Sequence, residues 1–284
     1  MVKGKDQVSD AALLGLIDRC RNAVLPGGRL ALHIGDAPIG YVNPDLAAAL
    51  DGFASTSPAG VTIAPRDAPR LADVAAALAS RFGYRLRDEA FDVRSHIDGP
   101  VLATLDRGAL PAFGVIGVGV HLNGFCRRAD GLHVWIAKRS AAKKRDPGKR
   151  DNLVGGGVSA GMTPFETLIK EAAEEAAIPA AIVASAQEVS RIAYTMQRPE
   201  GLRRDLLVCY DLELPDDFIP HPADGEVESF EPIPAGRLPE LMASTDTVKF
   251  NVNLVLIDFL LRHRILPDPS GVIRATLAAQ PPAP

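Results

Sequence analysis

The segment of residues 155–179, GGGVSAGMTPFETLIKEAAEEAAIP, constrains the fold more than any other part of the chain. Its three glycines are followed by Thr-Pro-Phe-Glu, which has the spacing of a capping box, with Thr163 as N-cap and Glu166 reaching back to it. This spacing predicts a helix from Thr163 to Ala177. Pro179 predicts the end of the helix, because a proline disfavours helical geometry at the residue before it.

Three carboxylates, those of Glu171, Glu174 and Glu175, crowd one face in the second half of this predicted helix. Each like-charge pair at this spacing costs about 0.2–0.5 kcal/mol, and negative charge near a helix C-terminus adds a comparable penalty. A solvated charged face is the ordinary explanation. Here the rest of the helix is rich in alanine, and a hard divalent cation such as Mg²⁺, which prefers oxygen ligands, would turn the repulsion into binding energy.

Composition narrows the classes of function. The chain has 284 residues, of which 47% are hydrophobic and 23% charged, so it can form one large domain or two ordinary ones. Its net charge of −4 argues against a general nucleic-acid or membrane-surface partner. No run approaches about 18 uninterrupted apolar residues, so we expect no membrane span.

The cysteines indicate a compartment. Cys20, Cys126 and Cys209 are odd in number and far apart, so they form neither a metal-spaced pair nor a disulfide framework. A reduced, cytoplasmic location is the simplest interpretation. The charged N-terminal segment is not followed by a clean apolar stretch, so no signal peptide is expected.

Residues 1–110 are expected to form a small N-terminal α/β domain. Periodicity and turn residues predict helices and strands in alternation. The helices are expected at 8–22, 43–50 and 68–83, and the strands at 29–35, 37–42, 90–96 and 101–107. This region shows no chemistry of its own, and we expect it to help cover a substrate pocket.

Residues 111–266 are expected to form the main domain, followed by a loose tail at 267–284. Strands are predicted at 113–125, 131–140, 188–197, 203–215 and 224–234, and a long helix at 247–266. A basic loop precedes the glycine run. Strands around a glycine run and its helix, with a second helix late in the chain, predict the α/β (α+β) class with a mixed sheet between helices.

At this point the sequence resembles a known family. The segment of residues 156–178 is similar to a Nudix box, G-x5-E-x7-R-E-U-x-E-E-x-G-U, where U is aliphatic. Gly156 matches its first glycine, the three glutamates match its REUxEE core, and Ala172 and Ile178 occupy aliphatic positions. Three positions depart from the pattern: Met162 replaces the early Glu, Lys170 replaces Arg and Ala177 replaces the last Gly.

Motifs outside the box resemble one branch of this family, the Nudix proteins related to thiamine pyrophosphokinase. They are GVHLNGF, WIAKRSAAKKRDPGKRDNLVGGG, KEAAEEA, YDLELPDDFIP, DGEVESF and KFNVNLVLIDFLLRH. The resemblance covers about residues 84–266 and implies a Nudix-type α/β/α sandwich. In that branch the early Glu is often missing, so Met162 weighs less against activity.

The resemblance implies hydrolysis of a nucleoside or other organic diphosphate with Mg²⁺ or Mn²⁺. The branch points to thiamine diphosphate or its oxidised analogues, cleaved to the monophosphate and phosphate. Two alternatives stay open: a catalytically weak binding or regulatory module, indicated by the three departures, and a hydrolase of a nucleotide diphosphate such as ADP-ribose. The expected partner is a small-molecule diphosphate, and the oligomeric state is open, with a dimer as one option.

Candidate site residues follow from these patterns. Glu171, Glu174 and Glu175 are the expected metal ligands and catalytic carboxylates, and Glu226 and Glu228, which alternate on a predicted strand, are further candidates for the base. The sequence leaves the identity of the base open. Candidate substrate-binding residues are Lys138, Arg139, Lys143, His121, Asn123, Gly155, Gly156 and Gly157. A solvated basic loop, a core histidine and glycines that only mark a turn are the plainer alternatives.

Overall fold

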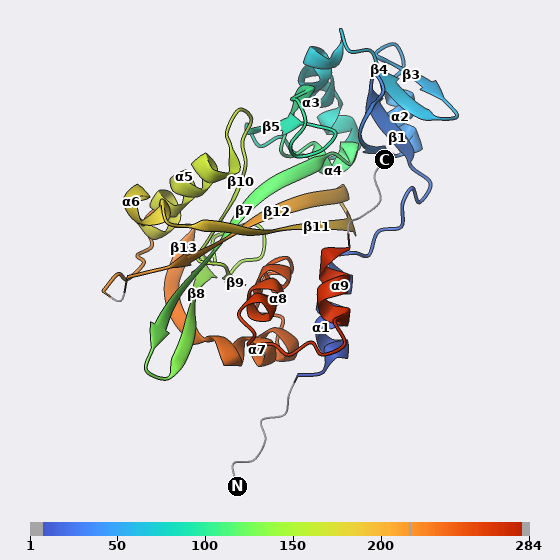
Figure 1. Ribbon diagram of the computed structural model, residues 1–284. Coiled ribbons are helices and arrows are strands. Elements are labelled where there is room, and N and C mark those ends of the chain that lie inside the picture. The colour runs from blue at the N-terminus through green and yellow to red at the C-terminus, as the bar shows by residue number, and fades with distance from the viewer. Residues whose placement is uncertain (1–7, 216, 280–284) are drawn as a thin grey trace.

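A mixed sheet of seven strands carries the candidate site in the computed structural model, which describes residues 8–215 and 217–279 (Figure 1). Its main path runs β11-β12-β7-β8-β13, with β10 paired to β7 and β9 paired to β8. The strands are β7 (Ile116–Arg128), β8 (Gly131–Arg139), β9 (Arg150–Asp151), β10 (Val154–Gly157), β11 (Gln187–Arg198), β12 (Gly201–Glu213) and β13 (Val227–Pro234). The central pair β7 and β12 is parallel and the other pairs are antiparallel, which confirms the predicted mixed sheet.

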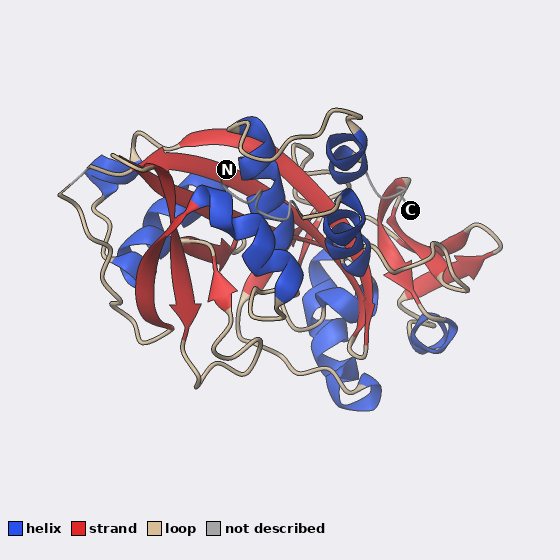
Figure 2. Cartoon of the chain, turned by 90° about the horizontal axis from the view of Figure 1, so that it is seen from below, coloured by secondary structure: helices blue, strands red, loops and turns tan. Residues whose placement is uncertain are grey.

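Helices cover both faces of this sheet. On one face α5 (Pro164–Ala176) packs with α6 (Ala180–Val183), and Leu168 and Ala172 of α5 are fully buried in a core with Val120 of β7. On the other face lie α1 (Asp10–Arg19), α7 (Leu238–Ser244), α8 (Val252–Arg262) and α9 (Val272–Ala278). Figure 2, the view from below, shows helices in front of the strands. The sheet between two helical layers confirms the predicted α/β/α sandwich.

The N-terminal region has its own small sheet and core. The sheet order is β2-β1-β4-β3, formed by β1 (Leu30–Ile34), β2 (Ala37–Val42), β3 (Ala54–Ser57) and β4 (Gly60–Ile63). Around it lie α2 (Pro44–Ala49), α3 (Leu71–Phe82) and α4 (Leu110–Phe113), with the paired strands β5 (Ala90–Val93) and β6 (Ala103–Asp106). Predicted helices and strands are found here, and Asn43 caps α2 as expected. β3 and β4 were not predicted from the sequence.

Two terminal segments lie elsewhere than the sequence suggested. Leu13 and Ile17 of α1 are fully buried in the core formed with α8, so α1 packs on the large sheet and not within the N-terminal unit. The tail after Pro267 is not loose over its described part, because α9 buries Ile273 and Leu277 in the same core. These two residues are four apart and form an apolar stripe among small residues, which is enough to hold a short helix.

Two further elements differ from the prediction. The glycine run is a strand, β10, and not a loop. The predicted long helix is confined to α8, because the chain before it is extended at Val248, which bridges to Arg150. Among the described residues no helix is long and apolar enough to span a bilayer.

α5 begins and ends at the predicted residues, with Thr163 as N-cap and Ala177 as C-cap. Thr163 and Glu166 form the capping box: the N–H of Glu166 donates to Thr163 Oγ1 at 3.2 Å, and the N–H of Thr163 donates to Glu166 Oε2 at 2.8 Å. The helix ends because Ala177 adopts the left-handed conformation, with φ of 52°. Its neighbour Ile178 is fully buried, which holds the turn in place.

We predict that Ala177→Gly stabilises the protein. Glycine adopts left-handed geometry without the steric cost that a Cβ imposes, so the free energy of unfolding should rise by about 1 kcal/mol. Urea unfolding of both proteins measures the change. Ala184→Gly at the right-handed C-cap of α6 is the control and should not be stabilising. A loss of stability in Ala177→Gly would contradict the prediction.

Candidate active site

Glu175 is the most buried carboxylate of α5, with 8% of its surface exposed. Its Oε2 accepts a hydrogen bond from the N–H of Gly155 in β10 at 3.0 Å, which joins the helix to the glycine strand. Burial raises the pKa of Glu175 to about 8, and the nearby charges of Asp151 and Glu171 add to the shift, while the Gly155 hydrogen bond opposes it. A buried carboxylate with this pKa is poised to change its protonation near neutrality.

Glu171 lies one helical turn earlier, directly against Gly156. A Cβ at Gly156 would stand 2.4 Å from Glu171 Cδ, so a side chain at this position of the strand would displace the Glu171 carboxylate. Burial raises the pKa of Glu171, and the charges of Glu174 and Glu226 raise it further, although Lys170 opposes the shift. Gly156 therefore matters through the space that it leaves for the carboxylate.

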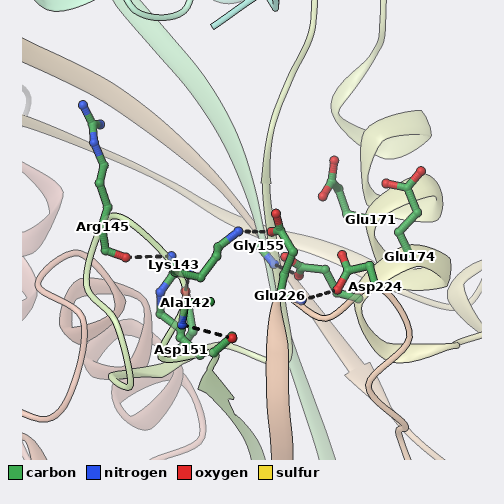
Figure 3. A network of polar contacts seen from close by, with 12 residues as sticks. Ala142, Lys143, Arg145, Asp151, Gly155, Glu171, Glu174, Asp224 and Glu226 are labelled. Atoms are coloured by element: carbon green, nitrogen blue, oxygen red, sulfur yellow. Dashed lines mark hydrogen bonds and ion pairs between the residues drawn. The ribbon is translucent and has the colours of Figure 1, made fainter. Parts of the chain in front are cut away.

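Glu174 and Lys170 lie at the edge of the site. Lys170 Nζ contacts Glu174 Oε2 at 2.6 Å and Glu171 Oε1 at 3.1 Å, so its ammonium neutralises part of the cluster. The Glu174 side chain is half exposed. Figure 3 shows Glu171 and Glu174 projecting from α5, with Glu226 on the opposite side and Lys143 reaching to it.

The two remaining candidate carboxylates have different surroundings. Glu226 precedes β13, forms an ion pair with Lys143, and lies close enough to Glu171 to raise its pKa. Glu228 pairs with Lys138 at 2.7 Å, and both side chains are about half exposed. A β-bulge between Val227 and Ser229 breaks the regular alternation from which the sequence analysis placed both glutamates on one side. Only Glu226 is shown to lie near the α5 cluster.

The carboxylates fit a hard divalent cation in their chemistry. Their donors are oxygens, Gly156 leaves the space that a side chain would fill, and the like charges that raise the pKa of Glu171 and Glu175 would be neutralised by a cation. In the described parts of the chain no three His, Cys, Asp or Glu side chains converge as a ready ligand set. Lys170 explains this, because its ammonium draws Glu171 and Glu174 toward itself.

The other face of the glycine strand meets His121. Gly155 pairs with His121 across the strands, and His121 Nδ1 lies 2.9 Å from Asn152 Oδ1. Burial lowers the pKa of His121 to about 4, and the charge of Lys249 lowers it further, so the imidazole is neutral at pH 7. Asn123, two residues along β7, instead connects the side chains of Asn152 and Asp211 inside the protein.

A buried ion-pair network lies beside His121. Asp151 is 5% exposed and accepts hydrogen bonds from Lys249 Nζ at 3.0 Å and Arg139 Nη1 at 2.8 Å. Burial alone would raise the pKa of Asp151, but the charge of Lys249, with His121 and Arg139, outweighs it and lowers the pKa to about 2. Arg139 also donates to the carbonyls of Arg145 and Asp146, so it shapes the basic loop from inside.

A cavity of about 110 Å³, which we call the basic cavity, opens along the glycine strand. Gly155, Gly156, Gly157 and His121, four of the candidate substrate-binding residues, line it. Its cationic walls were not predicted, and they come from four separate parts of the chain: Arg107, Arg145, Arg203, Arg204 and Lys249. Burial lowers the pKa of Arg145, and the neighbouring charge of Arg203 lowers it further, which indicates a crowded positive site.

The predicted basic residues are not in the walls of this cavity. Lys138, Arg139 and Lys143 are held by Glu228, Asp151 and Glu226, respectively. From the basic loop only Arg145 lines the cavity, among the residues that the structure describes. Nothing in the local sequence distinguishes a lysine paired with a carboxylate from an arginine that faces a cavity.

The N-terminal unit contributes to the basic cavity through two stacked side chains. Phe91 and Arg107 both line it, and the Arg107 guanidinium lies 5.7 Å from the centre of the Phe91 ring. A Cβ at Gly157 would stand 2.6 Å from Phe91 Cζ, so the ring packs directly on the glycine strand. Arg107 is also paired with Glu89 at 2.8 Å.

Comparison with known proteins agrees with this geometry. Residues 119–251 match the family model described as the NUDIX domain. Nudix hydrolase 20, chloroplastic, of Arabidopsis thaliana is 42% identical over 189 residues, which cover 66% of this chain and 50% of that protein. Nudix hydrolase 24, chloroplastic, of the same plant is 39% identical over 189 residues, covering 66% of this chain and 52% of its own length. This chain therefore carries a Nudix domain and has Nudix hydrolases among its relatives.

These matches have defined limits. The chain spans about half the length of the two plant relatives. Among solved structures, that of DR0079 from Deinococcus radiodurans matches with 24% identity and a TM-score of 0.46, covering 60% of this chain and 98% of that one. The resemblance to the Nudix family is confirmed, whereas the narrower likeness to the branch related to thiamine pyrophosphokinase stays a prediction.

The raised pKa of Glu175 makes stability depend on pH. A carboxyl whose folded pKa exceeds its unfolded pKa stabilises the fold below the unfolded value, and this contribution is lost as the pH rises through the folded pKa of about 8. Glu175→Gln abolishes this titration. In buffer with EDTA, the wild type should therefore lose on the order of 3 kcal/mol relative to the variant between about pH 5 and pH 8.

Urea unfolding of both proteins across this pH range measures the effect. Glu231→Gln, at an exposed position of β13, is the control and should follow the wild type. Parallel stability curves for the wild type and Glu175→Gln would show that Glu175 is ionised in the folded protein at all these pH values.

Proposed function

We propose that this chain is a hydrolase of organic diphosphates that works with bound Mg²⁺ or Mn²⁺. One observation carries the proposal: the glycine strand has the α5 carboxylates, of which Glu175 is buried, on one face and the basic cavity on the other. Glu171 lies against Gly156, while Gly155 and Gly157, which alternate with it, face His121 and Phe91. A cation and a diphosphate would thus be bound on adjoining surfaces of one strand.

Glu171, Glu174 and Glu175 would hold the cation, with Glu226 opposite them. When bound, the cation would neutralise charge on the diphosphate and acidify a water molecule. Holding it would require Glu171 and Glu174 to exchange the ammonium of Lys170 for the metal. Lys170 carries a compact ammonium and lacks the planar guanidinium of an arginine. The metal would therefore have to displace only a single point charge from the carboxylates.

The side chains of the basic cavity would bind the phosphates. Lys249, Arg145, Arg203 and Arg107 supply positive charge around the neutral imidazole of His121. Phosphoryl transfer depends mostly on positioning and on neutralising spread negative charge, which such a cavity provides. A water oxygen attacks phosphorus, the bridging P–O bond breaks, and the water proton passes to a carboxylate. Glu171, Glu174, Glu175 and Glu226 are the candidate acceptors.

The preferred substrate is thiamine diphosphate or an oxidised analogue, cleaved to the monophosphate and phosphate. Sequence motifs outside the Nudix box support this choice. An ADP-ribose-like nucleotide diphosphate is the alternative, since the cationic cavity would accept either diphosphate. The two substrates differ in the organic part attached to the diphosphate. A substrate panel therefore separates them.

A second candidate is a Nudix-fold binding module with little catalysis. The ion pairs of Lys170 favour it, because an ammonium already satisfies Glu171 and Glu174. Ligand-induced stabilisation without turnover is the result that this candidate predicts.

Phosphate release tests the proposed activity directly. With Mg²⁺ or Mn²⁺, the wild type should hydrolyse at least one member of a panel containing thiamine diphosphate, its oxidised analogues and ADP-ribose. Glu174→Gln and Glu175→Gln should each lower kcat by about 100-fold or more, because ligands that neutralise transition-state charge are lost. Glu231→Gln should retain wild-type activity. Binding of the panel without phosphate release at any metal concentration would favour the binding module.

Arg107 tests the expected contribution of the N-terminal unit. Arg107→Ala removes a cation from the basic cavity, so KM for the best substrate should rise about tenfold while kcat changes little. Arg66→Ala, on an exposed loop of the same unit, is the control. Unchanged KM in Arg107→Ala would show that the N-terminal unit does not touch the substrate phosphates.

A further inference from the structure

A second, larger cavity lies on the α5 face of the sheet, and we call it the apolar cavity. Its volume of about 490 Å³ is in the range of small-molecule sites. Its walls come from strands β7, β11 and β12, from the segment Phe91–Ile97 of the N-terminal unit, and from the start of α5. Most of this lining is apolar, with Ile116, Val118 and Leu206 on the sheet side.

Two buried polar residues lie side by side in this wall. Thr195 of β11 pairs with Arg204 of β12 across the antiparallel strands, and both line the cavity. Thr195 is 4% exposed, and its Oγ1 has no hydrogen-bond partner among the described residues. A buried hydroxyl without a partner costs free energy unless something supplies one.

Arg204 is equally unusual. It is 6% exposed, and in the described chain it forms no ion pair with a carboxylate. Its Nη1 donates to the carbonyl of Gly114 at 3.0 Å, and its guanidinium lies over the ring of Tyr41 at 5.3 Å. Burial lowers the pKa of Arg204 to about 10, which reflects the cost of a buried cation.

The acidic side chains that line this cavity are already engaged, and Asp92 pairs with Arg94 at 2.8 Å. Asp205 lines the same cavity, but its Oδ2 accepts from Arg203 Nε at 2.6 Å and from the Tyr194 hydroxyl. The polar end of the apolar cavity therefore offers a guanidinium and a hydroxyl whose hydrogen-bonding capacity is only partly used. Such a pair suits an anionic group of a ligand, because carboxylates bind guanidinium groups with strong, directed hydrogen bonds.

We propose that the apolar cavity binds a small organic anion, with its anionic end on Arg204 and Thr195 and an apolar ring system along the sheet. Phe91 and His96 supply aromatic side chains to the same wall, which favours a flat ring over an extended aliphatic chain. The site goes beyond the diphosphate chemistry. It shares Phe91, Val118, Arg204 and Asp205 with the basic cavity, but none of the α5 glutamates lines it.

The test compares two probes by titration calorimetry: 1-naphthoate and the uncharged alcohol 1-naphthalenemethanol. The wild type should bind naphthoate about tenfold or more tightly than the alcohol, because only naphthoate carries the charge that Arg204 would recognise. Thr195→Val keeps the shape of the side chain and removes the hydroxyl. It should weaken naphthoate binding several-fold without lowering the melting temperature, since the hydroxyl has no partner among residues 8–215 and 217–279.

Two further variants complete the design. Thr167→Val makes the same change at another buried, unpartnered hydroxyl, which lies outside the apolar cavity, and should leave naphthoate affinity unchanged. Ala193→Phe adds a ring inside the cavity and should abolish binding of both probes.

Equal affinity for the two probes would overturn the proposal. So would unchanged naphthoate binding in Thr195→Val, which would reduce the unpartnered hydroxyl to a packing feature. Phosphate release is measured on the same proteins and should be retained in Thr195→Val. Loss of the proposed hydrolase activity would not alter the naphthoate result, so the two proposals stand or fall separately.

Discussion

The hydrogen bond from the Gly155 N–H to the buried carboxylate of Glu175 is the contact on which the rest of the site depends. It ties the last turns of α5 to an added strand of the central sheet, and it places a carboxylate where water has little access. That position is costly for a charge, as the raised pKa of Glu175 shows. The glycine strand and α5 must approach closely for this contact. Gly156 permits this approach, because a side chain at that position would collide with the Glu171 carboxylate.

Charges of opposite sign lie on the two sides of the glycine strand. Carboxylates gather on the α5 face, whereas cations surround the basic cavity. The buried Asp151 pairs with Lys249, which lines the basic cavity, and with Arg139, which donates to carbonyls of the basic loop. The glycine strand thus separates two opposite electrostatic environments. The carboxylate side would suit a metal cation, and the basic cavity would suit a diphosphate.

The N-terminal unit is part of this arrangement. Phe91 lies on Gly157 and takes part in the walls of both cavities, while Arg107 stacks on the Phe91 ring. The basic and apolar cavities are both closed by residues from outside the Nudix domain match at residues 119–251. Any ligand of either cavity would therefore contact a unit that the domain model does not include.

Features that depend on residues close together in the chain could be predicted from the amino-acid sequence. The capping box at Thr163, the helix that carries three glutamates, the alternating strands and the Nudix box are all visible because short-range periodicity and capping act within a few residues. Which charged side chains lie next to one another could be seen only in the folded protein. Arg107, Arg203 and Lys249 are separated by long stretches of chain, and Lys138 and Lys143 are diverted to surface carboxylates that strand pairing brings beside them. The folding of the glycine run into a strand was equally hidden, because its pairing with β7 depends on a partner more than thirty residues away.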